Sequence, residues 1–176
     1  MRTLSKPLFQ LTAGDLMSAM VVNIPQDMSL QGAARRLTEY QVSGAPVVDD
    51  EGRCVGVISA SDFVHWAGDA NKARHQPVSP GCVCASWQIV DAEQISNDDR
   101  VSVFMTADPV TVVSTTPVQK LAKMMLDAHI HRLIVVDRQQ HPVGIITSTD
   151  ILAALARAGE FSPDPRAETE PACAGK

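Results

Sequence analysis

The strongest constraint in this sequence is an internal repeat. Displaced by 88 residues, which is the separation of Met17 from Met105, the chain aligns with itself without a gap. Apolar, glycine and acidic positions coincide, and Asp62 falls on Asp150. Self-similarity at one fixed spacing indicates a duplicated structural unit. Two copies predict a closed pair with pseudo-twofold symmetry rather than a solenoid.

Both copies carry the same order of secondary-structure signals. A short β-branched run precedes an amphipathic helix, and two apolar strands then form a hairpin before a final helix near Ser59 or Thr147. The expected ranges are 21–24, 29–40, 45–48 and 54–58 in the first copy, and 110–113, 117–128, 133–136 and 143–146 in the second. This order predicts an α+β fold of two βαββα-type repeats, each a three-stranded sheet flanked by helices.

The repeat also sets the expected domain organisation. The first repeat spans residues 12–66 and the second spans residues 101–157. The linker 67–100 is rich in Gly, Pro, Ser and Asp, with one short strand expected at 87–90. A linker of this length is either functional or mobile. The polar tail 158–176 contains several prolines and is expected to be disordered.

Charge and hydropathy exclude several classes of function. The 176-residue chain has a net charge of −5, which disfavours nucleic acid as a partner because phosphate binding needs a concentrated basic face. No apolar run approaches the roughly 18 residues of a membrane span. Residues 1–10 lack the apolar core of a signal peptide. We therefore expect a cytoplasmic protein without a membrane or nucleic-acid partner.

The most specific local motif is Gly-x-x-[Ser/Thr]-x-x-Asp, which occurs at 56–62 and again at 144–150. In one interpretation the hydroxyl residue caps a helix, the Asp complements the helix dipole, and the glycine permits close packing. In the other, the hydroxyl and the helix start bind phosphate, the Asp accepts ribose hydroxyls, and the glycine lets a ligand approach. The motif alone leaves both interpretations open.

Taken together, the repeated features resemble the cystathionine β-synthase (CBS) domain, and the tandem arrangement resembles a CBS pair, or Bateman module. The likeness covers about residues 12–66 and 100–157. It depends on an ordered set of short pieces, which are 15–17, 45–49 and 56–62 in the first copy and 103–105, 133–137 and 144–150 in the second. Each piece is weak alone, but their order and common spacing are specific.

The resemblance implies a module with two clefts that bind an adenosine compound, such as AMP, ADP, ATP, S-adenosylmethionine or a dinucleotide, as a regulatory ligand. No cofactor is required. By this likeness Asp62 and Asp150 take ribose hydroxyls, and Ser59 and Thr147 approach phosphate. The remaining expected site residues are Val22, Ile24, Ala45, Pro46 and Ser61 in the first copy, and Val110, Val112, Leu133, Ile134 and Thr149 in the second.

The copies differ where the second strand begins. Arg132 aligns with Gly44, and Ile134 replaces Pro46. An Arg at this place resembles the phosphate-contacting Arg of nucleotide-binding members, and its planar fork suits phosphate oxygens. The alternative is an exposed arginine at a strand edge. We expect the two sites to be unequal, with one binding an adenine nucleotide more tightly.

A weaker candidate site lies in the linker, where Cys82 and Cys84 have His75 and His65 nearby in sequence. Two thiolates at this spacing can share a zinc ion, but further ligands are not obvious, and an ordinary loop is the simpler interpretation. No Ser-His-Asp or Cys-His set has the sequence context of a catalytic nucleophile. We expect neither a metal site nor enzyme activity.

Two functions remain open after these exclusions. The first is a regulatory sensor that binds an adenosine nucleotide and signals to a partner protein in trans. The second is a structural or dimerisation module that binds no nucleotide.

Residues 151–156 are apolar on every side of the predicted final helix, which predicts burial all round and a contact between subunits. We expect a homodimer.

Overall fold

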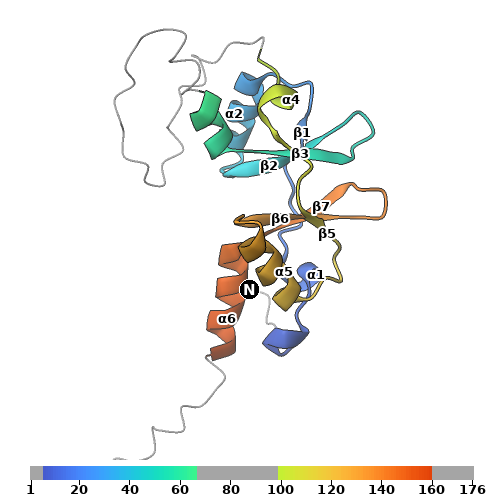
Figure 1. The fold of residues 1–176 in the computed structure, drawn as a ribbon, viewed down its shortest axis with the longest axis vertical. Coiled ribbons are helices and arrows are strands. Elements are labelled where there is room, and N and C mark those ends of the chain that lie inside the picture. Colours follow the sequence, from blue (N-terminus) through green and yellow to red (C-terminus); the bar gives the residue numbers. More distant parts are fainter. Residues whose placement is uncertain (1–5, 67–98, 160–176) are drawn as a thin grey trace, which may run out of the picture.

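The computed structural model describes residues 6–66 and 99–159. Two sheets lie one above the other in the middle of the molecule, and helices cover their outer faces (Figure 1). The two hairpins point in the same direction, so the halves are related by pseudo-twofold symmetry as the repeat predicts. The α+β prediction is confirmed. The predictions for residues 67–98 and 160–176 lie outside the described residues.

The first sheet has the strand order β1-β2-β3-β4, with a parallel β1–β2 pair and antiparallel neighbours beyond it. Its strands are β1 (Ile24–Pro25), β2 (Gly44–Val48), β3 (Cys54–Ser59) and β4 (Thr106–Ala107). Helix α2 (Leu30–Glu39) and the helical residues 60–66 belong to the same half. The three expected strands are joined here by a fourth, because β4 comes from the sequence of the second repeat.

The second sheet has the order β5-β6-β7 and the same parallel and antiparallel pairs. Its strands are β5 (Thr111–Val112), β6 (Arg132–Val136) and β7 (Pro142–Thr147). Helices α5 (Val118–Asp127) and α6 (Ser148–Gly159) accompany it. The first strands, expected at 21–24 and 110–113, are each reduced to two residues.

Local chemistry explains where the amphipathic helices begin. The Ser29 hydroxyl accepts a hydrogen bond from the Gly32 N–H at 3.1 Å and so caps α2. Pro117 occupies the N-cap of α5, so this helix begins one residue after the start of the expected range 117–128. Each helix buries one stripe at i, i+3 and i+7, formed by Leu30, Ala33 and Leu37 in α2 and by Val118, Leu121 and Met125 in α5.

Each repeat begins with a leading segment that docks on the opposite half. We call residues 11–18, which contain α1 (Ala13–Leu16), the first leading segment, and residues 99–107, which contain α4 (Val101–Phe104), the second. The Ala13 N–H donates to the Thr116 carbonyl at 2.8 Å, and the Val101 N–H donates to the Met28 carbonyl at 3.0 Å. The two hydrogen bonds join equivalent positions, because Ala13 aligns with Val101 and Met28 aligns with Thr116. The halves therefore exchange their leading segments.

The exchange continues at the sheet edges. Ser18 and Ile145 each donate a backbone hydrogen bond to the other, at 2.9 and 3.0 Å. The equivalent residues of the other pair, Thr106 and Val57, are partners in the β3–β4 ladder. The expected repeat boundaries follow the sequence period, whereas in space the first leading segment belongs with the second sheet and the second with the first.

The glycine of the repeated motif makes room for this exchange. A Cβ on Gly144 would collide with the Met17 sulfur and lie 3.0 Å from the Met17 Cβ. A Cβ on Gly56 would collide with the Met105 sulfur in the same way. The space that a side chain would take is thus filled by a methionine of the opposite leading segment. Close packing, one of the two interpretations of this glycine, accounts for it.

The last helix is less buried than its composition predicts. Only Ala154 among residues 151–156 is fully buried, and Leu152 and Leu155 are 62% and 54% exposed. The expectation that α6 is covered on every side was wrong for the single chain, because the helix lies at the outside of the lower half (Figure 1). α6 also continues to Gly159, two residues beyond the expected end of the repeat at 157.

Candidate functional site

The hydroxyl and the Asp of each motif are joined at the place where the hairpin's last strand passes into a helix. The Ser59 N–H and hydroxyl both donate to Asp62 Oδ2, at 2.6 and 2.9 Å. The Thr147 N–H and hydroxyl donate to Asp150 Oδ2, at 2.7 and 2.6 Å. Among the described residues, nothing donates to the Oδ1 of either Asp. Each carboxylate therefore has one oxygen without a donor in the described part of the chain.

These hydrogen bonds alone do not identify a ligand site. The same arrangement occurs at the start of α1, where the Thr12 N–H and hydroxyl donate to Asp15 Oδ2 at 2.9 and 2.8 Å. There it stabilises the first turn of a short helix, and Lys6 together with Thr12 lowers the pKa of Asp15 to about 2. Helix capping thus explains the hydroxyl–Asp contact wherever it occurs. Evidence for a ligand has to come from other groups around the motif.

Arg132 provides such a group, and it serves the opposite repeat. From the start of β6 its side chain crosses to the first half, where Nη2 donates to the Ser43 hydroxyl at 2.6 Å. Nη1 fills the space beside Gly44 and is buried without a hydrogen-bond partner among the described residues. Burial lowers the pKa of Arg132, and the neighbouring Asp62 carboxylate opposes this shift. The guanidinium therefore belongs with the Asp62 motif, not with Asp150 of its own repeat.

The alignment of Arg132 with Gly44 makes the two motifs unequal. A Cβ on Gly44 would meet the guanidinium and would lie 2.8 Å from the Ile58 carbonyl oxygen, so only glycine fits opposite this arginine. By the same pseudo-symmetry, the position that could reach across to the Asp150 motif is Gly44, which has no side chain. Among the described residues, Arg132 thus lies beside the Asp62 motif, and its equivalent in the alignment, Gly44, supplies no cation to the Asp150 motif.

The apolar residues expected to hold adenine divide into two groups. Four have their side chains in the helix-facing cores, and these are Ile24, Ala45, Val112 and Leu133. Only their backbone remains for a ligand. Pro46 and Ile134 alternate with Ala45 and Leu133 along β2 and β6, so these buried residues face the opposite sheet.

The other expected site residues lie nearer the surface. Val22 packs partly against the first core, and Val110 is 37% exposed. The Ser61 hydroxyl lies 2.7 Å from that of Ser59 and so joins the first motif. Thr149 is exposed beside the second motif. The structure thus brings Ser59, Ser61, Asp62 and Arg132 together, whereas Val110 and Thr149 are exposed at the surface.

Two polar residues near the first motif escaped the sequence analysis. Ser43, the partner of Arg132, aligns with His131 and carries no signal in the sequence. Asn23 interrupts a β-branched run, and the equivalent residue of the second repeat is Thr111. A polar asparagine within an apolar run is the one feature of the sequence that could have pointed to this residue. The Asn23 Oδ1 is buried and has no hydrogen-bond partner among the described residues.

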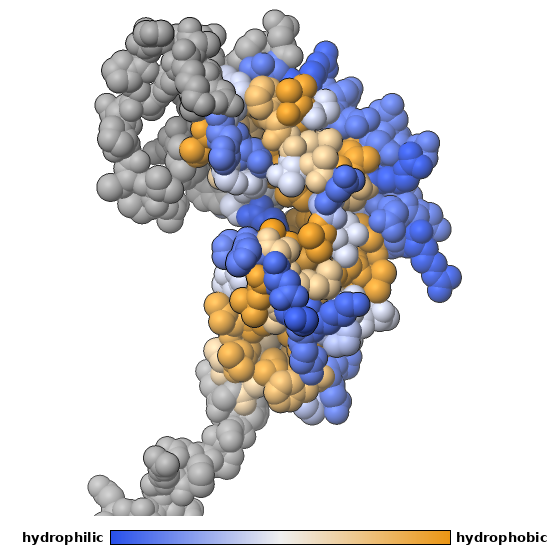
Figure 2. Space-filling view, viewed as in Figure 1, coloured by the Kyte–Doolittle hydropathy of each residue, from blue (hydrophilic) through white to orange (hydrophobic). Residues whose placement is uncertain are grey.

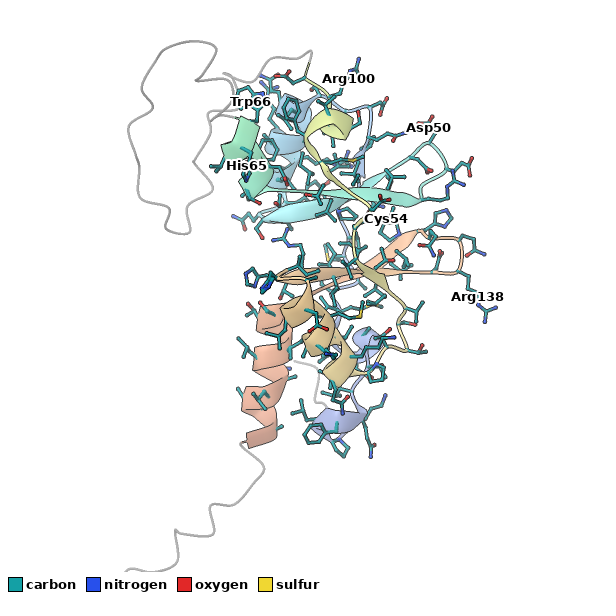
Figure 3. All side chains as sticks on the ribbon, viewed as in Figure 1. Asp50, Cys54, His65, Trp66, Arg100 and Arg138 are labelled. Carbon is teal, nitrogen blue, oxygen red and sulfur yellow. The ribbon has the colours of Figure 1, made fainter. Side chains whose placement is uncertain are left out.

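The alternative metal site finds no support in the described residues. His65 lies on the outer helix of the upper half, far from Cys54 near the middle of the molecule (Figure 3). Burial raises the pKa of the Cys54 thiol to about 11, which disfavours the thiolate that metals bind. No group of three His, Cys, Asp or Glu residues gathers within 6–66 and 99–159. Cys82, Cys84 and His75 lie outside these ranges.

Within the part of the chain that the structure describes, no helix combines the length and apolar character that crossing a bilayer demands.

Comparison with known proteins identifies the repeat. The CBS domain family matches the chain twice, at residues 13–69 and 100–157. The chain is 29% identical over 135 residues to the chloroplastic CBS domain-containing protein CBSX1 of Arabidopsis thaliana, an alignment that covers 73% of the chain and 57% of that relative. The chain thus spans little more than half the length of this relative.

Solved structures share the fold. The CBS domain pair of protein MJ0100, in complex with 5′-methylthioadenosine and S-adenosyl-L-methionine, has a TM-score of 0.61 and 25% identity over 83% of this chain and 96% of that one. CBSX2 in complex with AMP has a TM-score of 0.64 over 85% of this chain and 98% of that one. At 24% sequence identity, this likeness is one of fold. The chain belongs to the CBS domain family and carries two CBS domains in tandem.

Proposed function

We propose that this CBS pair is a regulatory sensor that binds an adenosine nucleotide at the Asp62 motif. The observation that carries the proposal is the buried, unpartnered Nη1 of Arg132 beside that motif. A buried charged donor without an acceptor is costly, and a phosphate oxygen would satisfy it with a charge-assisted bond. AMP bound to CBSX2, a structure of the same fold, supports this class of ligand.

The neighbouring groups fit the rest of such a ligand. The Oδ1 of Asp62 would accept ribose hydroxyls, and the Ser61 hydroxyl would donate to phosphate, because the Ser59 hydroxyl already donates its hydrogen to Asp62. In the second motif, Asp150 and Thr147 offer the ribose contact without the cation. We therefore propose that the Asp150 motif favours adenosine compounds without phosphate, a class that includes the two ligands of MJ0100.

The regulatory role follows from where the ligand would sit. A ligand that contacts Asp62 from one repeat and Arg132 from the other would favour one relative position of the repeats, and a partner protein in trans would respond to that change. We place this activity in the cytoplasm. Two relatives are named L-aspartate semialdehyde sulfurtransferase, but the matched region covers only 23% and 22% of them, so we propose no enzyme activity for this chain.

Calorimetric titration with two matched variants tests the nucleotide site. We expect AMP to bind the unmodified protein, and Asp62→Ala to weaken this binding by at least tenfold, because the ribose contact is lost. Asp150→Ala is the control and should leave the AMP affinity within about twofold. Absence of heat with AMP, ADP, ATP, S-adenosylmethionine and methylthioadenosine would overturn the proposal. So would an AMP affinity that depends on Asp150 and not on Asp62.

We also propose that two copies associate through α6. Figure 2 shows hydrophobic residues over this helix in the lower half, and hydrophilic residues over the hairpin ends on the opposite side. Leu152 and Leu155 supply much of this apolar surface, which monomers rarely leave exposed. The same surface favours the second candidate function, a dimerisation module, which does not require nucleotide.

Light scattering at micromolar concentration tests the dimer. We expect twice the chain mass of 18.9 kDa for the unmodified protein and the mass of a single chain for Leu152→Glu, since a buried charge would oppose association. Val103→Glu is the control, because Val103 is 72% exposed on α4 in the other half. A single-chain mass for the unmodified protein would contradict the proposal.

A further inference from the structure

Two buried side-chain atoms lack a hydrogen-bond partner in the described part of the chain, and they are complementary. One is the donor Nη1 of Arg132, and the other is the acceptor Oδ1 of Asn23. A folded protein rarely buries a polar atom without a partner, because the atom loses its hydrogen bonds to water. The nucleotide proposed above would satisfy Arg132. It leaves the role of Asn23 unexplained.

Strand geometry places Asn23 on the same face as the arginine contact. Ile24 pairs with Val47 in β2, and both side chains lie in the helix-facing core. Since side chains alternate along an extended strand, the preceding Asn23 points to the opposite face, towards the second sheet. Gly44, against which Arg132 packs, lies on that face too, because it is an odd number of residues from Val47. Both unpartnered atoms therefore face the space between the repeats.

The separation of the two positions fits opposite ends of a nucleotide. In the register of β1 and β2, Asn23 lies beside Pro46, the residue before Val47. Pro46 is two residues along β2 from Gly44, so Asn23 is two residues along and one strand across from Gly44. With a rise of about 3.3 Å per residue and strands about 4.8 Å apart, the separation is roughly 8 Å. Ser59 pairs with Gly44, so the phosphate and ribose groups gather at that end of the sheet. Asn23 is left at the end where the base would lie.

We infer that Asn23 is a specificity-determining residue of the Asp62 site, whose Oδ1 accepts a hydrogen bond from an amino group on the base of the ligand. The inference rests on the proposed nucleotide site and deepens it. A 6-aminopurine would satisfy this acceptor, whereas a 6-oxopurine would place a second acceptor against it. The site therefore selects adenine over hypoxanthine. Thr111, the equivalent residue of the second repeat, has a hydroxyl that both donates and accepts, so it does not impose this selection.

Calorimetry with AMP and inosine monophosphate tests the inference. We expect the unmodified protein to bind AMP at least tenfold more tightly than inosine monophosphate. Asn23→Val should weaken AMP binding about five- to tenfold and leave inosine monophosphate unchanged, so that the preference largely disappears. Thr111→Val is the matched control and should alter neither affinity at this site. Thermal unfolding of ligand-free Asn23→Val should show no loss of stability, because the substitution removes an unpaired acceptor.

The outcomes separate this inference from the function on which it rests. If the unmodified protein binds neither nucleotide, the proposed function fails and the inference with it. If it binds AMP but Asn23→Val keeps the same preference, only the inference is overturned. A preference of the unmodified protein for inosine monophosphate would also overturn it. A lowered melting temperature for both Asn23→Val and Asn23→Thr would make Asn23 a structural residue and overturn it as well.

Discussion

Replacing Arg132 with glutamine is expected to weaken AMP binding by about 10- to 100-fold, the loss typical of one hydrogen bond to a charged group. Glutamine keeps a polar side chain with a donor, although it is two bonds shorter than arginine, and it has no positive charge for the phosphate. Binding of adenosine, which lacks the phosphate, should remain within about twofold at the Asp62 motif, measured with Asp150→Ala in both proteins so that the second motif does not contribute. Calorimetric dissociation constants for both ligands provide the measurement. The difference between the ligands isolates the phosphate contact from any general effect on the fold.

Arg138→Gln is the matched control for this experiment. Arg138 lies at the exposed end of the β6–β7 hairpin, away from the Asp62 motif (Figure 3), and its loss removes the same charge from the chain. It should leave the affinity for AMP unchanged. Equal weakening of AMP and adenosine by Arg132→Gln would show a structural role instead. An unchanged affinity for AMP would show that Arg132 does not contact the phosphate.

Gly144→Ala is expected to destabilise the protein by about 1–3 kcal/mol, the usual cost of overpacking a close contact. The new methyl group would collide with the sulfur of Met17 and lie 2.9 Å from its Cγ and 3.0 Å from its Cβ. A shift of the flexible end of Met17 does not relieve the contact with its Cβ. Urea unfolding of the variant, compared with the unmodified protein, measures the loss.

A double-mutant cycle then tests the exchange of leading segments. Gly144→Ala combined with Met17→Ala should be less destabilised than the sum of the single changes, by about 1 kcal/mol, because the sulfur and Cγ of Met17 are removed and only the contact with Cβ remains. Gly144→Ala combined with Met105→Ala should be additive, since Met105 packs on Gly56 in the other half. The reverse result, coupling to Met105 and additivity with Met17, would mean that each segment docks on its own repeat.

The exchange bears directly on how a ligand would act. Each sheet is completed by a segment from the other repeat, through the Ser18–Ile145 bonds on one side and the β3–β4 pairing on the other. Neither half keeps all its contacts if the two separate. A ligand held by Asp62 and Arg132 would therefore stabilise both halves as a single cooperative unit.

The sequence predicts the elements of each repeat better than their connection. Periodic apolar residues in α2 and α5 and the continuous apolar strands β2 and β6 are local signals, so their ranges follow closely from the pattern. The exchange gives no such signal. Because the copies are alike, Met17 satisfies the same pattern whether it packs on Gly56 or on Gly144, and only the three-dimensional structure distinguishes the two.

The candidate site shows the same limit. The repeated motif locates the hydroxyl–Asp pairs, but Thr12 and Asp15 form the same contact as a simple helix cap. The alignment of Arg132 with Gly44 predicts inequality between the sites without saying which motif gains the charge. That depends on the packing of the sheets, which brings Arg132 across to Ser43. Burial of α6 was overestimated because composition does not reveal what covers a helix in one chain.

A crystal structure of the protein grown with AMP tests the central claim most directly. The account predicts one AMP between the repeats, with its ribose hydroxyls at Asp62, its phosphate within hydrogen-bond distance of the Arg132 guanidinium, and its base towards Asn23. AMP bound only at Asp150, or AMP at Asp62 with its phosphate directed away from Arg132, would contradict it.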